Sequence, residues 1–153
     1  MNTEKKIIAV SGGFDPVHIG HVRMFEEAKK LGTHLVVIIN SDEWLKRKKG
    51  FAFMPEKERA ELIKKFAAVD DTHVHNSDDI HVSDALRDYT MEIDGERHPI
   101  HVFANGGDRK NEADIPEAQV CKEKDIEMIF NVGAGGKVQS SSWLTDAVKG
   151  GKL

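Results

Sequence analysis

Hydrophobic positions along this chain follow two patterns that alternate from one end to the other. Short, nearly continuous apolar runs are typical of buried strands, and they lie within residues 5–13, 34–42, 72–76, 98–108 and 126–133. Apolar residues recur at helical spacing in the stretches between and after them, at 21–32, 54–69, 77–93, 114–125 and 140–150. The pattern therefore predicts strands and helices in regular alternation.

Regular alternation of this kind is typical of a parallel sheet with helices on both faces. Because crossover connections are right-handed, we expect a doubly wound, Rossmann-like α/β fold of about five strands in the order 3-2-1-4-5. Ligands of such folds bind beyond the carboxyl ends of the strands, where the strand order reverses. The loops that we expect to meet at this cleft are 11–18, 40–42, 104–108 and 131–137.

Composition limits the kind of protein. The 153 residues contain no repeat or long linker, so we expect a single domain over 1–153. The formal net charge of −4 gives no general attraction to nucleic acid or anionic lipid. No apolar run approaches the ~20 residues of a membrane span, and the first residues lack the apolar segment of a signal peptide. With Cys121 as the single cysteine, the chain is expected to be cytoplasmic, without nucleic-acid or membrane partners.

Candidate chemistry begins directly after the first apolar run. Gly12 and Gly13 permit backbone N–H groups to approach an anion at the start of the following helix. His18 and His21 are three residues apart, so they share one face of the first helical turn, and Gly20 leaves room for a ligand between them. Two imidazole donors at a positive helix end suit a phosphate whose negative charge grows during a reaction.

The stretch GGFDPVHIGH at 12–21 resembles the signature of the cytidylyltransferase-like nucleotidyltransferases, among them glycerol-3-phosphate cytidylyltransferase and the adenylyltransferase domain of ADP-heptose synthase. Further matches are INSDEWLKRKKG, MPEKERAEL, GGD and SSSWL, in the family's order, and the resemblance covers nearly the whole chain. It implies an enzyme that transfers a nucleoside monophosphate from CTP or ATP to a sugar phosphate or polyol phosphate and releases pyrophosphate.

The resemblance also implies roles for individual residues. His18 and His21 would be catalytic, donating to the α-phosphate and to the leaving pyrophosphate. The nucleotide would be held by the backbone of Gly13 and Phe14, by Gly107 and Asp108, and by the serine triplet Ser140, Ser141 and Ser142.

One lysine of the run 46–49 is expected to reach a phosphate. Counting back from Arg59 favours Lys48, as a catalytic cation, whereas the heptose-type pattern favours Lys46. Arg59 itself either forms an ion pair with a loop carboxylate or binds phosphate. Asp15 is expected to fix the glycine loop.

Several choices stay open at this stage. Mg²⁺ is expected to arrive with the nucleoside triphosphate, because the sequence shows no cluster of metal ligands. Lys137 is the one cation before the serine triplet, where the cytidylyltransferases carry an arginine, so CTP and ATP are both retained. The acceptor pocket is expected within 70–100, with His75 and His81 as candidates, and the family is compatible with a homodimer. The alternative function is a non-catalytic nucleotide-binding or regulatory module of the same fold.

Overall fold

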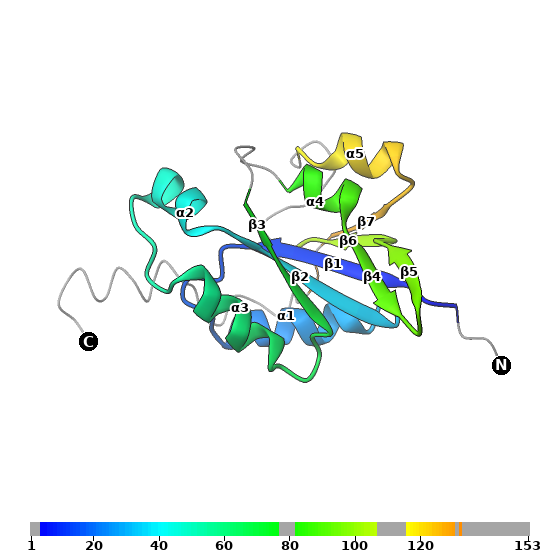
Figure 1. The fold of residues 1–153 in the computed structure, drawn as a ribbon, viewed down its shortest axis with the longest axis horizontal. Coiled ribbons are helices and arrows are strands. Elements are labelled where there is room, and N and C mark those ends of the chain that lie inside the picture. The colour runs from blue at the N-terminus through cyan, green and yellow to red at the C-terminus, as the bar shows by residue number, and fades with distance from the viewer. Residues whose placement is uncertain (1–3, 77–81, 107–115, 131, 133–153) are drawn as a thin grey trace.

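The computed structural model describes residues 4–76, 82–106, 116–130 and 132 (Figure 1). The elements in these ranges are β1 (Ile7–Gly12), α1 (Ile19–Lys29), β2 (His34–Asn40), α2 (Asp42–Lys49), α3 (Glu56–Lys64), β3 (Asp71–His75), α4 (Ser83–Asp88), β4 (Thr90–Ile93), β5 (Glu96–Pro99), β6 (Val102–Ala104), α5 (Ala118–Glu123) and β7 (Glu127–Ile129).

Five of the strands form one parallel sheet in the order β3-β2-β1-β6-β7. Counted among parallel strands alone, this order is 3-2-1-4-5, so the predicted topology is confirmed. The order reverses between β1 and β6, which are neighbours in the sheet although β2, β3, β4 and β5 lie between them in the chain. The carboxyl ends of β1 and β6 therefore lie side by side, at the place where folds of this type bind ligands.

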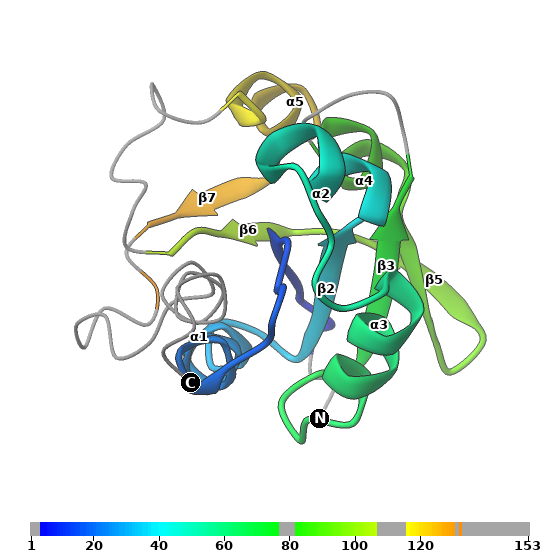
Figure 2. The same ribbon diagram turned by 90° about the vertical axis from the view of Figure 1, so that its left-hand side faces the viewer.

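Helices cover both faces of this sheet, and the alternation of side chains along the strands divides the core in two. One core holds Ile8 and Val10 with Phe25 of α1 and Ile63 of α3. The other holds side chains of the opposite strand face, packed against α4 and α5. In both ribbon views α2 lies on the side of α4 and α5, at the end of β2, whereas α1 and α3 lie on the other side (Figures 1 and 2).

A β-hairpin replaces part of an expected helix. The helical spacing over 77–93 predicted one helix, but α4 ends at Asp88 and the chain continues as β4, which pairs antiparallel with β5. Asp94 and Gly95 connect the two strands with φ values of 53° and 84°. Positive φ at both central residues is the requirement of a type I′ turn, for which Asp-Gly is a preferred sequence. The expectation of helix over 90–93 was therefore wrong. The range 98–108, expected to hold one strand, contains the last two residues of β5 and then β6.

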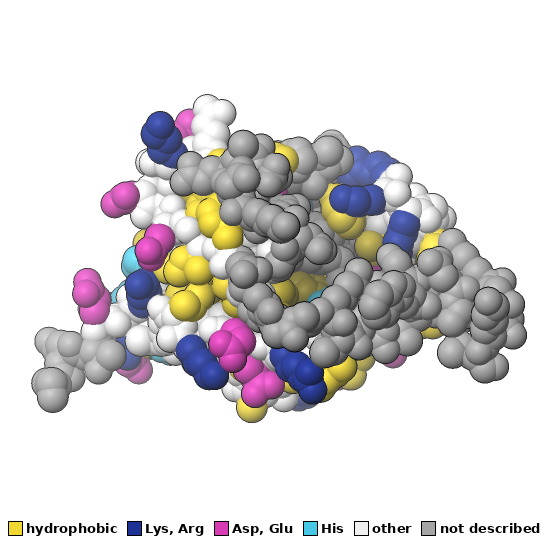
Figure 3. Space-filling view, turned by 180° about the vertical axis from the view of Figure 1, so that it is seen from behind, with side chains coloured by type: hydrophobic (Ala, Val, Ile, Leu, Met, Phe, Trp, Pro, Cys, Tyr) yellow, Lys and Arg dark blue, Asp and Glu magenta, His cyan; other side chains and the backbone are white. Residues whose placement is uncertain are grey.

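Charge is mixed on the surface of the described residues. Along the lower edge of the rear view, Lys and Arg side chains lie beside Asp and Glu side chains (Figure 3). In the ranges that the structure describes, no helix has the length and apolar character needed to cross a membrane. The expected helix at 140–150 lies outside these ranges.

Candidate active site

Gly12 at the end of β1 and Gly13 directly after it are closely packed against neighbouring side chains. A Cβ atom on Gly12 would lie 3.0 Å from the ring of Phe14, and one on Gly13 would lie 2.9 Å from Cδ2 of Leu45 in α2. Both distances are shorter than ordinary contacts between carbon atoms. Packing against Phe14 and α2 therefore favours glycine at both positions, although the atoms met are ends of side chains that can shift, and this adds to the phosphate approach that the sequence suggested.

The side chain of Phe14 packs against the ring of His21. The residue adopts a left-handed backbone conformation, with φ of 52°, and is 4% exposed. Its ring meets His21 edge-on at 4.8 Å between centroids and Phe25 at 5.4 Å. The ring of Phe14 therefore belongs to the core, which leaves its backbone as the part that can meet a nucleotide.

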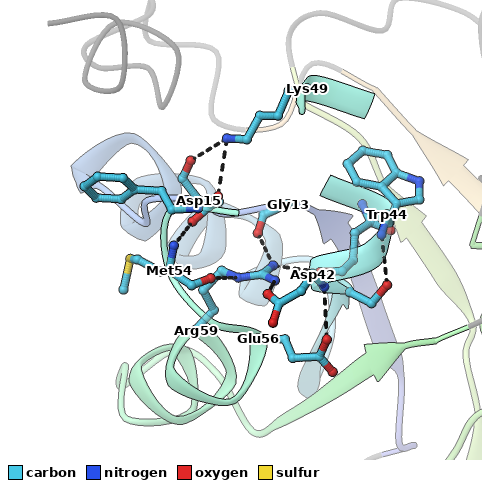
Figure 4. A network of polar contacts seen from close by, with 11 residues as sticks. Gly13, Asp15, Asp42, Trp44, Lys49, Met54, Glu56 and Arg59 are labelled. Carbon is cyan, nitrogen blue, oxygen red and sulfur yellow. Dashed lines mark hydrogen bonds and ion pairs between the residues drawn. The ribbon is translucent and has the colours of Figure 1, made fainter. Parts of the chain in front are cut away.

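Asp15 ties this loop to the segment after α2, as expected of a residue that fixes the loop. Its carboxylate is buried and accepts hydrogen bonds from the N–H groups of Phe53, at 2.6 Å, and Met54. Lys49 lies 3.4 Å from the same carboxylate and donates to the Asp15 carbonyl at 2.9 Å (Figure 4). The peptide bond between Asp15 and Pro16 is cis. Asp15 is consequently occupied by contacts within the chain.

Arg59 is the centre of a second network, which we call the Arg59 network (Figure 4). The side chain is fully buried, and its Nη1 donates to the carbonyls of Gly13 and Asn40, both at 2.7 Å. Nε donates to the carbonyl of Met54 at 2.8 Å, and Nη2 forms an ion pair with Asp42 at 2.8 Å. Of the two roles that the sequence left open, the ion pair with a loop carboxylate is the one observed. Arg59 thereby joins the loops after β1 and β2 to α3.

The Arg59 network also orients a backbone N–H group. A trans peptide unit directs its carbonyl and its N–H to opposite sides. Because the Gly13 carbonyl points to Arg59, the N–H of Phe14 in the same peptide unit points away from it. Arg59 can therefore position this donor without touching a ligand.

His18 and His21 form a capping box at the start of α1. Nδ1 of His18 accepts from the N–H of Gly20 at 3.1 Å, and Nδ1 of His21 accepts from the N–H of His18 at 3.2 Å. The two rings are stacked, with centroids 3.7 Å apart and planes 23° apart. Since each Nδ1 accepts, the proton of each neutral imidazole is on Nε2. The pair therefore presents two N–H donors of defined tautomer.

The environment keeps His21 uncharged. Burial, and next the neighbouring His18, lower the pKa of His21 from its ordinary 6.5 to about 3. At neutral pH the ring is a hydrogen-bond donor without a net charge, and it accepts no further proton. This property suits stabilisation of phosphate oxygens rather than transfer of a proton by His21.

The four basic residues 46–49 lie in the last turn of helix α2, which directs their side chains to different surroundings. Ser41 caps the helix through a hydrogen bond from the N–H of Trp44 at 3.2 Å, an element that the strand and helix patterns did not predict. Lys49 turns inward to Asp15, whereas Lys46 and Lys48 are exposed. Nζ of Lys48 lies 4.9 Å from the centroid of the Trp44 ring. A phosphate contact by Lys46 or Lys48 stays a prediction.

The loop after β6 approaches the same region. A Cβ atom on Gly106 would lie 3.6 Å from Sδ of Met24, so the end of β6 lies against α1. The predicted nucleotide contacts Gly107, Asp108, Ser140, Ser141 and Ser142 lie outside the described residues, as does His81. Within the described ranges, no group of three or more His, Cys, Asp or Glu residues is arranged to hold a metal ion.

Curated relatives resemble this chain over part of their length. A FAD synthase of Pyrococcus horikoshii is 44% identical over 73 residues, which cover 46% of this chain and 49% of the relative. The bifunctional protein HldE of Streptomyces coelicolor is 36% identical over 120 residues, which cover 76% of this chain and 23% of the relative. The matches thus span about half or less of the length of these relatives.

Solved structures share the fold. A lipopolysaccharide core biosynthesis protein from Thermoplasma volcanium aligns with a TM-score of 0.65 and 23% identity, over 84% of this chain and 97% of the other. A putative nicotinate-nucleotide adenylyltransferase from Vibrio parahaemolyticus aligns with a TM-score of 0.57 and 16% identity, over 98% and 90%. In sequence, residues 9–133 match the family described as cytidylyltransferase-like. Because this match runs from within β1 through His18 and His21 to past the end of β7, the chain belongs to the cytidylyltransferase-like family.

Proposed function

We propose that the protein is a nucleotidyltransferase, which transfers a nucleoside monophosphate from a nucleoside triphosphate to a phosphorylated acceptor and releases pyrophosphate. The observation that carries the proposal is the stacked pair of His18 and His21 at the start of α1. Capping fixes both Nδ1 atoms as acceptors, which leaves the Nε2–H groups as donors. Membership in the cytidylyltransferase-like family supports the same function.

The reaction needs little from the protein besides position and electrostatics. An oxygen of the acceptor phosphate attacks the α-phosphorus, and the bond from that phosphorus to the oxygen bridging the β-phosphate breaks. Pyrophosphate leaves with the electron pair of that bond. An acceptor phosphate is already ionised at neutral pH, so the attack requires no general base. This agrees with a His21 whose pKa is lowered to about 3.

His18 and His21 would donate to oxygens of the α-phosphate and of the leaving pyrophosphate as negative charge gathers there. The N-terminus of α1 adds a positive potential at the same place. The Phe14 N–H, oriented by Arg59, is a further donor for the triphosphate. The nucleotide would bind as its Mg²⁺ complex, in which the cation offsets phosphate charge, so Mg²⁺ enters with the substrate.

ATP is the nucleotide that we favour for the transfer. FAD contains an adenosine monophosphate group joined through a diphosphate, and relatives of this chain include a FAD synthase. A fold neighbour bears the name of an adenylyltransferase. For the acceptor we propose a sugar phosphate or polyol phosphate, and for the assembly a homodimer. CTP is the comparison nucleotide in every assay.

The test is pyrophosphate release with each of the four nucleoside triphosphates against a panel of phosphorylated sugars, polyols and flavin mononucleotide. His18→Asn and His21→Asn are the informative variants, because Oδ1 of asparagine can replace Nδ1 as the capping acceptor while the Nε2–H is lost. We expect each variant to lower kcat by roughly 10²-fold with the fold intact. Normal turnover in both variants would contradict the proposal. Binding of a nucleotide without release from any pair would favour the non-catalytic module, and sedimentation of the sample tests the homodimer.

A further inference from the structure

Two polar side chains lie together at the carboxyl ends of β2 and β3. Asn40 and His75 are register partners in the parallel pairing of these strands, so their side chains face the same side of the sheet. Ile38, two residues before Asn40, belongs to the core that packs against α4 and α5. Asn40 and His75 therefore extend this face of the sheet at its ligand-binding edge, where the apolar residues end.

Both side chains are buried with a polar atom unpaired. Asn40 is 5% exposed and His75 is 4% exposed. Oδ1 of Asn40 and Nε2 of His75 have no hydrogen-bond partner in the part of the chain that the structure describes. Buried polar atoms are paired in the great majority of cases, and an exception points to a bound group. Here two exceptions are neighbours, which favours one group that serves both.

The main chain of Asn40 is held independently of its side chain. Its carbonyl accepts from Nη1 of Arg59 at 2.7 Å, within the Arg59 network. The position of Asn40 at the end of β2 is thereby fixed by a bond that any residue at this position could make. The amide group is not needed for this bond and is available for recognition.

The chemistry of the two atoms selects a class of ligand. An amide oxygen only accepts, whereas Nε2 of a histidine donates or accepts according to its tautomer. A hydroxyl group both donates and accepts, so adjacent hydroxyl groups can satisfy both atoms. A phosphate at this place would bring its own oxygens against the Asn40 oxygen. Helix α2 begins two residues after Asn40 and carries Lys46 and Lys48 in its last turn, which suit the phosphate of the same molecule.

We propose that Asn40 and His75 bind the hydroxyl groups of a polyol phosphate, the acceptor of the transfer. This inference rests on the proposed function, which supplies the acceptor. The shared chemistry is a hydroxylated chain ending in a phosphate, and it occurs both in free polyol phosphates and in the ribityl chain of flavin mononucleotide. A ligand hydroxyl would replace a water molecule that can bridge the side chains of Asn40 and His75.

The test compares ligands that differ in their hydroxyl groups. Ribitol 5-phosphate, flavin mononucleotide and n-pentyl phosphate share a five-carbon phosphate ester, but n-pentyl phosphate lacks the hydroxyls. Calorimetric titrations are run with and without a non-hydrolysable ATP analogue, so that they do not depend on turnover. We expect the wild-type protein to bind at least one hydroxylated ligand about tenfold more tightly than n-pentyl phosphate. The stronger of the two identifies the source of the polyol.

The variants are His75→Leu and Asn40→Leu, with His73→Leu as the matched control. His73 is on the same strand and the same face, two residues earlier, and its ring packs against Tyr89 at 5.5 Å. Both test variants should weaken the hydroxylated ligand about tenfold and leave n-pentyl phosphate and ATP unchanged. Their melting temperatures should not fall, because leucine removes an unpaired buried polar group. The control should keep the preference for hydroxyls.

The outcomes separate this inference from the proposed function. The inference is overturned if the wild-type protein binds hydroxylated ligands no more tightly than n-pentyl phosphate. It is also overturned if both test variants keep the wild-type preference, because a bridging water would then be the partner of Asn40 and His75. Loss of the preference in the variants together with no pyrophosphate release from any pair would overturn the proposed function alone. With turnover, the KM for the acceptor should rise in the variants while the KM for ATP is constant.

Discussion

Acid should destabilise this protein through His21. The pKa of His21 is lowered to about 3 in the folded chain, whereas an unfolded chain would show the ordinary 6.5. Below pH 6.5 the unfolded state binds a proton that the folded state does not, so the free energy of unfolding falls as the pH falls. The stability contributed by the neutral ring is complete above 6.5 and is lost progressively toward 3.

The magnitude follows from the width of this window. Each pH unit below 6.5 costs about 1.4 kcal/mol while only the unfolded state is protonated. Moving from pH 7.5 to pH 5 crosses about 1.5 such units, which gives a loss of about 2 kcal/mol from His21. This figure changes little for any folded pKa below about 4, because the folded ring is then neutral at pH 5.

Urea unfolding at the two pH values, in wild type and His21→Asn, isolates this loss. Burial also lowers the pKa of His73 and His101, so these residues contribute in the same direction. They are present in both proteins and cancel when the two pH dependences are subtracted. We expect wild type to lose about 2 kcal/mol more than the variant between pH 7.5 and pH 5. Equal losses in the two proteins would refute the neutral, buried His21.

Three further predictions concern packing and charge. Arg59→Met should lower the free energy of unfolding in urea by about 3–5 kcal/mol, because Asp42 and the bonded carbonyls lose their partner. The control, Arg87→Met, removes an exposed ion pair and should cost less than about 0.5 kcal/mol, so similar losses in the two variants would contradict the Arg59 network. Gly32→Ala should cost about 1–3 kcal/mol, since its Cβ would lie 2.6 Å from the carbonyl oxygen of Lys6, and an unchanged melting temperature would exclude that contact. Exchanging the exposed Lys46 and Lys48 for Glu should raise the KM for the nucleoside triphosphate or for the acceptor about tenfold, while the free energy of unfolding changes by less than about 0.5 kcal/mol. If neither KM changes, the lysines at 46 and 48 only form a solvated surface.

The sheet could be predicted because its signals are local and its topology is restricted. Continuous apolar runs such as 35–39 identify buried strands, and right-handed crossovers then leave few possible strand orders. The hairpin of β4 and β5 was missed because apolar residues at helical spacing run through α4 and past its end. The Asp94-Gly95 pair, preceded by the alternating polar and apolar residues of β4, was the signal for the hairpin.

The site was predictable only in part. The position of His18 and His21 at the start of α1 follows from the sequence, because a strand, a glycine loop and a helix succeed one another there. The partners of Arg59 do not, since they lie on segments that meet only after folding. The pairing of Asn40 with His75 likewise depends on the register between β2 and β3, which neither strand encodes alone.

The Arg59 network has a consequence for which substitutions the site tolerates. Three of the four groups bonded by Arg59 are main-chain carbonyls, at Gly13, Asn40 and Met54, and every amino acid provides such a carbonyl. The arginine therefore holds the loops without specifying the side chains at 40 and 54. Those positions are open to change toward a new acceptor while the scaffold under the histidines persists. Side chains at 40 and 54 can thus be exchanged in this chain while the same guanidinium holds the two loops.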